Sequence, residues 1–226
     1  MPQSFDAEAF LNQPIYAWDT LTLLGDIEDF IDFSEANIEW QLKRELRRLK
    51  TEHADVIIDD PYTDAQYKDQ QIEGTEYRFN VSLAQRVRYS ALTALITSVE
   101  WSILVLRRRA QFTIPDKPEK LSEAVHLISV FTSKVQQDLS AEEALLSMLV
   151  QVRNCIVHSS GRIETYKYAT DLRQRLLDFQ GIRLSSISFL GEGIEIEPGF
   201  LQGVLERAKR WLPTLEKALY EGGHIK

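Results

Sequence analysis

The segment RYSALTALITSVEWSILVL, residues 88–106, decides the fold of this chain. Its apolar residues recur every three or four positions, which is the spacing of one face of an α-helix. They are Leu92, Leu95, Ile96, Val99, Ile103 and Leu106. The pattern extends from about Ser82 to Arg109, where an arginine triplet suits the C-terminal end of a helix. We therefore expect a long core helix here.

The residues before this segment predict more helix and a loop. Residues 18–52 carry apolar side chains at helical spacing, with a break expected near residues 33–36 that makes two helices. Residues 55–79 are polar and contain proline and glycine, which indicates a long loop. We divide the chain into an N-terminal helical extension with an acidic loop, residues 1–74, and a helical bundle, residues 75–226.

The residues after it predict helices and one hairpin. Helices are expected at residues 121–137, at 165–179, at 200–220, and from an N-cap at Ser140 to a stop near Gly161. Residues 185–199 alternate in hydrophobicity around a turn at Gly191-Glu192-Gly193, with Phe189 among the apolar positions. A lone hairpin must lie on the helices. The fold class is therefore all-α, an antiparallel helical bundle with one small β-hairpin before the C-terminal helix.

Composition restricts the function classes. The net charge is −8, so the chain lacks the basic excess of proteins that bind nucleic acid mainly by neutralising phosphates. Its positive charge is local, in residues 42–50, 85–88 and 107–109. A single cysteine, Cys155, allows no internal disulfide, and we expect a cytoplasmic protein. The apolar run 91–106 is short and contains Glu100, so no membrane association is expected.

A polar motif interrupts the apolar end of a predicted helix. In QVRNCIVHSSGRI, residues 151–163, Arg153 falls inside the apolar arc of the helix, whereas Asn154 and His158 are neighbours on its polar side. A buried arginine without a partner costs several kcal/mol. Glu100, at the edge of the stripe in the core helix, is the best candidate partner. The pair is interpreted either as part of a site or as an internal ion pair that fixes two helices.

The run Arg153-Asn154-Cys155-Ile156-Val157-His158 resembles the signature of HEPN domains, in which an arginine precedes a polar residue and, a few positions later, a histidine. Residues 88–106 are similar to the upstream helix of bacterial HEPN-like proteins, which often carries a glutamate at the position of Glu100. The resemblance covers roughly residues 80–220 and implies a helical bundle with the motif on a late helix.

The resemblance also implies metal-independent RNA cleavage at a homodimer cleft, by a toxin or defence effector that needs no cofactor and that some antitoxin protein accompanies. Histidine transfers protons near neutral pH, so His158 takes the acid–base role. Arg153 takes the phosphate role and Asn154 an orienting role, with Glu100 and Ser159 in support. Because Arg153 and His158 lie about 140° apart on the helix, the arginine must bend or the helix must loosen near Ser159.

Two alternatives stay open from the sequence. One is a non-catalytic HEPN-like module that dimerises or binds a nucleotide or protein partner with the same residues. The other is a metal enzyme, which is disfavoured because the four histidines show no ligand spacing; they are His53, His126, His158 and His224.

Overall fold

The computed structural model describes residues 18–226 except 57, 59, 120, 178 and 189–190. The described helices are α2 (Trp18–Asp55), α3 (Pro61–Tyr77), η1 (Arg78–Leu83, a π-helix), α4 (Ala84–Arg109), α5 (Glu123–Val135), α6 (Ser140–Ser159), η2 (Ile163–Thr165), α7 (Ala169–Leu176) and α8 (Phe200–Glu221). Strands β1 (Ile182–Ser188) and β2 (Gly191–Ile196) form an antiparallel pair before α8. The predicted fold class is confirmed.

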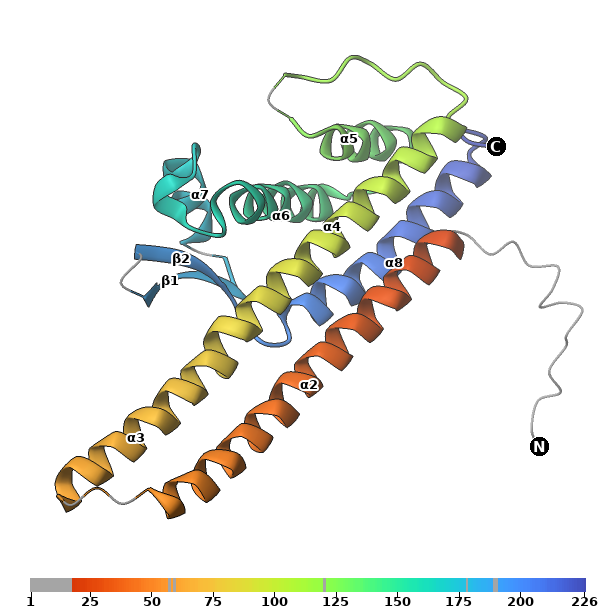
Figure 1. Cartoon of the computed structure of the whole chain (residues 1–226). Coiled ribbons are helices and arrows are strands. Elements are labelled where there is room, and N and C mark those ends of the chain that lie inside the picture. Colours follow the sequence, from red (N-terminus) through yellow and green to blue (C-terminus); the bar gives the residue numbers. More distant parts are fainter. Residues whose placement is uncertain (1–17, 57, 59, 120, 178, 189–190) are drawn as a thin grey trace, which may run out of the picture.

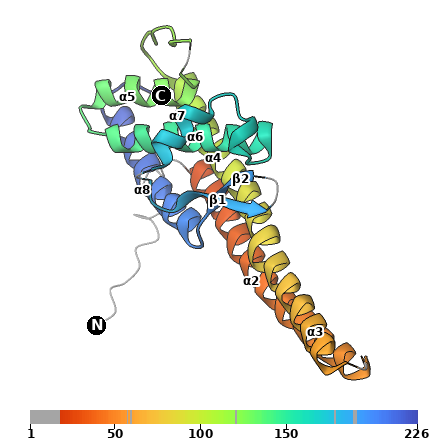
Figure 2. The same ribbon diagram turned by 90° about the vertical axis from the view of Figure 1, so that its left-hand side faces the viewer.

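Helix α4 is the central element of the bundle (Figure 1). Helix α2 runs antiparallel beside α4 and contacts α8, whereas α5, α6, α7 and the hairpin lie on the other side of α4, as both views show (Figures 1 and 2). Together α3 and the second half of α2 form an arm that projects from the bundle. The apolar stripe extends along most of α4. Several helices must therefore pack around α4 to bury it.

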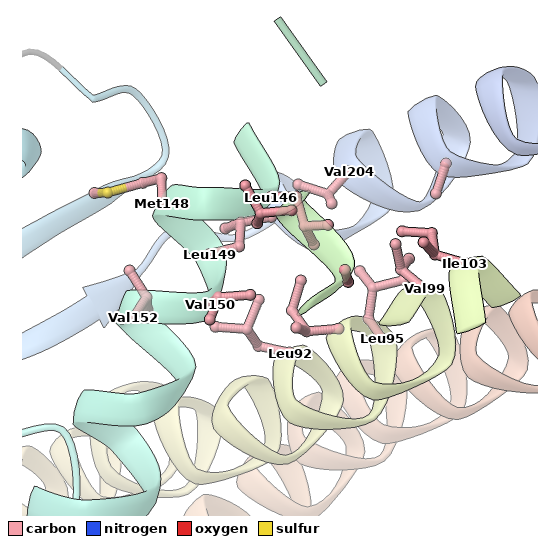
Figure 3. Close-up of a cluster of buried hydrophobic side chains, with 14 of the residues drawn as sticks. Leu92, Leu95, Val99, Ile103, Leu146, Met148, Leu149, Val150, Val152 and Val204 are labelled. Carbon is pink, nitrogen blue, oxygen red and sulfur yellow. The ribbon is translucent and has the colours of Figure 1, made fainter. Parts of the chain in front are cut away.

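The core is where α4, α6 and α8 meet (Figure 3). All six apolar residues of the predicted stripe in α4 are at most 4% exposed. In the close-up Leu92, Leu95, Val99 and Ile103 face labelled apolar side chains of α6, with Val204 of α8 beside them. Leu24, Ile27 and Ile31 of α2 belong to the same core, so the N-terminal helix packs on the bundle. The domain division at residue 74 stays a prediction, and residues 1–17 of the predicted extension lie outside the described residues.

Helix α2 is continuous, and the break predicted near residues 33–36 is wrong. No glycine or proline stands there to end the helix. Glu35, within the expected break, accepts hydrogen bonds from Nε (2.6 Å) and Nη2 (3.0 Å) of Arg88 on α4. Because Arg88 is only 7% exposed, this bidentate pair holds the middle of α2 against the core.

The long loop predicted for residues 55–79 is wrong, because most of it is helix α3. The Asp60 side chain accepts a hydrogen bond from Thr63 N at 2.9 Å, and Pro61 occupies the first turn. An aspartate N-cap followed by proline is a helix start. The polar composition was misleading because α3 has no buried residue and is a solvated helix of the arm.

Helices α3 to α4 form one continuous run, Pro61–Arg109, that contains a stretch apolar and long enough to cross a membrane. Length and composition alone do not decide whether this helix crosses a membrane, so the expectation of no membrane association stays a prediction. The same apolar face forms the core of the bundle, and core helices ordinarily pass this criterion.

Three further boundaries differ from the sequence predictions. Leu139, and not Ser140, is the N-cap of α6, and Ser140 donates its backbone N–H to Asp138 Oδ1 (3.0 Å). The helix predicted at 165–179 is divided into η2 and α7. The predicted turn at Gly191–Gly193 is part of β2, since Gly193 pairs with Ser185 and also bridges to Arg162. Phe189 lies outside the described residues.

The hairpin lies on α4, as expected for an isolated strand pair. Gln85 exchanges two hydrogen bonds with the backbone of Ile196: its Nε2 donates to the carbonyl (3.0 Å) and its Oε1 accepts from the N–H (2.9 Å). Ile182, Ile194 and Ile196 are at most 1% exposed. The side chain of Gln85 therefore makes the backbone hydrogen bonds that a neighbouring strand would otherwise make with Ile196 of β2. These bonds hold the hairpin against α4.

Candidate functional site

Arg153 of α6 and Glu100 of α4 form a bidentate ion pair. Nη1 of Arg153 donates to Oε2 of Glu100 at 3.0 Å, and Nη2 donates to Oε1 at 3.3 Å. The two side chains are about one-fifth exposed, at 19% and 21%. The predicted pairing is confirmed, and it fixes the plane of the guanidinium between two packed helices.

Asn154 binds the same guanidinium from a different side. Nε of Arg153 donates to Oδ1 of Asn154 at 3.0 Å. Asn154 lies on the polar side of α6, the side that also carries His158. Within the described part of the chain, the remaining N–H groups of the guanidinium have no hydrogen-bond acceptor.

His158 is exposed in the last turn of α6, one turn after Asn154. The helix keeps its geometry through Ser159, and the left-handed conformation begins at Ser160 (φ 52°). The helix therefore does not loosen near Ser159, and the approach of Arg153 to His158 stays a prediction. Ser159 contributes its carbonyl to Arg162 N (2.9 Å), and its predicted supporting role stays a prediction.

A packed turn fixes the end of α6 beside the motif. Gly161 has φ +78°, and a Cβ there would come within 2.5–2.8 Å of the Tyr89 ring of α4. Tyr89 in turn donates its hydroxyl to the carbonyl of Ile194 in β2, and Ile194 N donates to the carbonyl of Gly161 (2.9 Å). Burial raises the pKa of Tyr89, so its hydroxyl stays a donor. No local sequence pattern predicts this contact, because Tyr89 and Gly161 lie far apart along the chain.

Cys155 lies within the motif but is buried. Its side chain is 0% exposed, and burial raises the pKa of the thiol to about 11. A thiolate is the nucleophilic form of cysteine, so this residue is a packing residue at neutral pH.

An exposed apolar side chain lies beside the motif on α6: Val157, 56% exposed, comes one turn after Arg153. Trp101, 40% exposed, follows Glu100 in α4 but lines a pocket with Trp18 and Thr20 of α2. Apolar side chains beside an exposed polar site favour contact with another molecule. Across the described residues, no three His, Cys, Asp or Glu side chains are grouped so that they could hold a metal ion.

Comparisons of the chain with protein-family models, with curated proteins and with solved structures found no match. The function is therefore inferred from the residues of this site.

Proposed function

We propose that this protein is a metal-independent endoribonuclease of HEPN type that cleaves RNA at a cleft between two copies of the chain. The observation that carries the proposal is the hydrogen-bonded set of Glu100, Arg153 and Asn154, which fixes a guanidinium on the helix that also exposes the imidazole of His158. A fixed cation and an accessible acid–base group are what phosphodiester cleavage without a metal requires.

The reaction is attack of the ribose 2′-hydroxyl on the adjacent phosphorus, with departure of the 5′-oxygen. One imidazole takes the proton of the 2′-hydroxyl, and an acid gives a proton to the leaving oxygen. The free N–H groups of Arg153 bind the phosphate oxygens, whose negative charge grows in the transition state. The products are a 2′,3′-cyclic phosphate and a 5′-hydroxyl.

The motif supplies one histidine per chain, whereas the reaction uses a base and an acid. Pairing of two α6 helices would bring His158 and His158 of the partner subunit to one phosphate. The exposed side chain of Val157 supports such pairing, since it lies one turn after Arg153 on α6. A toxin or defence effector of the cytoplasm, held inactive by an antitoxin, is the biological role that we propose for such an activity.

One observation favours a second function, a non-catalytic module that dimerises or binds a nucleotide. Both carboxylate oxygens of Glu100 bind the guanidinium of Arg153, which offsets the positive charge that a phosphate would meet. An arginine neutralised in this way serves helix packing.

An RNA cleavage assay separates the two functions. Purified protein is incubated with single-stranded RNA and EDTA, and the fragment ends are examined for cyclic phosphate. We expect cleavage by the natural chain and loss of cleavage in His158→Ala. His126→Ala is the matched control, because His126 contacts the carbonyl of Pro115 and takes no part in the motif. Circular dichroism confirms that both variants fold.

No cleavage of a diverse RNA pool by the natural chain would favour the non-catalytic module. Equal activity in His158→Ala and in the natural chain would remove the motif from the mechanism.

A further inference from the structure

Helix α2 exposes large aromatic side chains along one line. Phe30 is 41% exposed, Phe33 is 74% exposed and Trp40 is 53% exposed. Each presents a large apolar side chain to solvent. A row of such side chains is typical of a surface that another molecule covers.

These aromatic residues form a stripe with three polar neighbours. At 100° per residue, six side chains between residues 26 and 44 of α2 fall within an arc of about 80°; they are Asp26, Phe30, Phe33, Asn37, Trp40 and Arg44. We call this set the α2 stripe. The buried residues Leu24, Ile27 and Ile31 lie on roughly the opposite side of the helix.

The α2 stripe is self-complementary about Glu35. Asp26 and Arg44 each lie nine positions from it, on either side, and Phe30 and Trp40 each lie five. Phe33 and Asn37 each lie two positions from it. In an antiparallel pair of identical helices with a two-fold axis at this point, every member of the stripe therefore faces another member.

We propose that the α2 stripe binds the α2 stripe of a second copy of this chain in an antiparallel, two-fold pair. Phe30 packs on the partner's Trp40, and Asp26 forms an ion pair with the partner's Arg44. Each contact occurs twice, and the paired region spans about 27 Å of helix.

The charges on the α2 stripe support pairing with a second copy of the chain. Asp26 has no ion-pair partner among the residues that the structure describes, whereas Arg44 stacks over the Trp40 ring with its guanidinium carbon 5.6 Å from the centroid. Arg44 therefore lies at the rim of the aromatic cluster, where an acidic group of the partner would meet it. A nucleic acid fits less well, because the N-terminal half of the stripe would place Asp26 and the adjacent Asp29 against phosphates.

This interface goes beyond the proposed nuclease. Helices α2 and α6 lie on opposite sides of α4 in both views (Figures 1 and 2), so stripe pairing leaves the Arg153 motif uncovered. Both pairings are compatible in one assembly, which would then be a tetramer or a higher oligomer.

Charge reversal tests the proposal, with molar mass as the readout. The full chain is examined by sedimentation over a series of concentrations. Asp26→Arg and Arg44→Asp each place like charges opposite one another twice per pair, so each weakens association at least about tenfold. The double variant restores opposite charges, and we expect association to return to that of the natural chain. Asp32→Arg, with the same charge change outside the stripe, is the control.

Phe33→Ser is a second, independent variant. The side chain of Phe33 is three-quarters exposed and contributes little to the fold of one chain, so a loss of association in this variant reports the interface itself. Tyr62→Ser, which changes an equally exposed aromatic residue on α3, is its control. The proposal is overturned by a natural chain whose mass is unaffected by the stripe variants, by a monomer at every concentration, or by a double charge reversal that does not restore association. RNA cleavage plays no part in these outcomes.

Discussion

Removal of either partner of the Glu100–Arg153 pair is expected to destabilise the protein, and removal of both is expected to cost less than the sum of the two. In Glu100→Ala the guanidinium keeps only Asn154 as a hydrogen-bond acceptor. In Arg153→Ala the carboxylate of Glu100 is left between two packed helices without its partner. The double variant leaves no unpaired charge behind.

The magnitude follows from the burial of the pair. Removing one partner of a fully buried ion pair costs about 3–5 kcal/mol, and we expect about 2–3 kcal/mol here because each side chain keeps one-fifth of its exposure. Two charge-assisted hydrogen bonds, screened to this degree, give a coupling energy of about 1–2 kcal/mol. For a chain of this length each single substitution lowers the melting temperature by about 4–12 °C.

Denaturant unfolding of the four proteins, the natural chain, the two single variants and the double variant, measures the coupling energy. The pair Arg173–Glu192, whose side chains are 39% and 41% exposed, provides a matched cycle in which the coupling should be no more than about 1 kcal/mol. Strictly additive losses for Glu100 and Arg153 would refute the reasoning, because they would mean that the two side chains do not interact.

Two further predictions concern residues next to the motif. Gly161→Ala should cost about 2–3 kcal/mol, because the new methyl group meets Tyr89 at a positive φ, whereas Gly199→Ala at φ +79° in open space should cost only about 1–2 kcal/mol; equal losses in denaturant unfolding would exclude the Tyr89 contact. Cys155 should resist alkylation by iodoacetamide at neutral pH until the chain unfolds. Because the pKa of this thiol in the folded chain is about 11, above its model-compound value of 9.0, the unfolded chain loses the proton first, and stability should fall as the pH rises through this interval. Cys155→Ala should show a shallower loss over the same interval, and an identical pH profile would contradict the assignment.

Local sequence signals accounted for the features that depend on one element at a time. The apolar spacing of residues 88–106 predicted α4, and the position of Arg153 in an apolar arc predicted a buried partner. The start of α3 also has such a signal, Asp60 followed by Pro61. The polar composition of the segment nevertheless favoured the prediction of a loop. Polar segments predict loops only when they have no partner helix, and α2 is a partner that the sequence alone does not place.

The sequence by itself determined the all-α fold class, the core face of α4 and the residues that compose the motif, because periodicity and the cost of an unpaired charge act within a few turns of helix. Only the tertiary structure decided how these residues meet. The hydrogen bond from Arg153 to Asn154, the contact of Gly161 with Tyr89 and the support of β2 by Gln85 join residues that are far apart along the chain or depend on a side-chain rotamer. The continuity of α2, held by Glu35 and Arg88, has the same origin. Spacing along a helix says which side a residue occupies, whereas the packing of neighbouring helices decides which of its rotamers is retained.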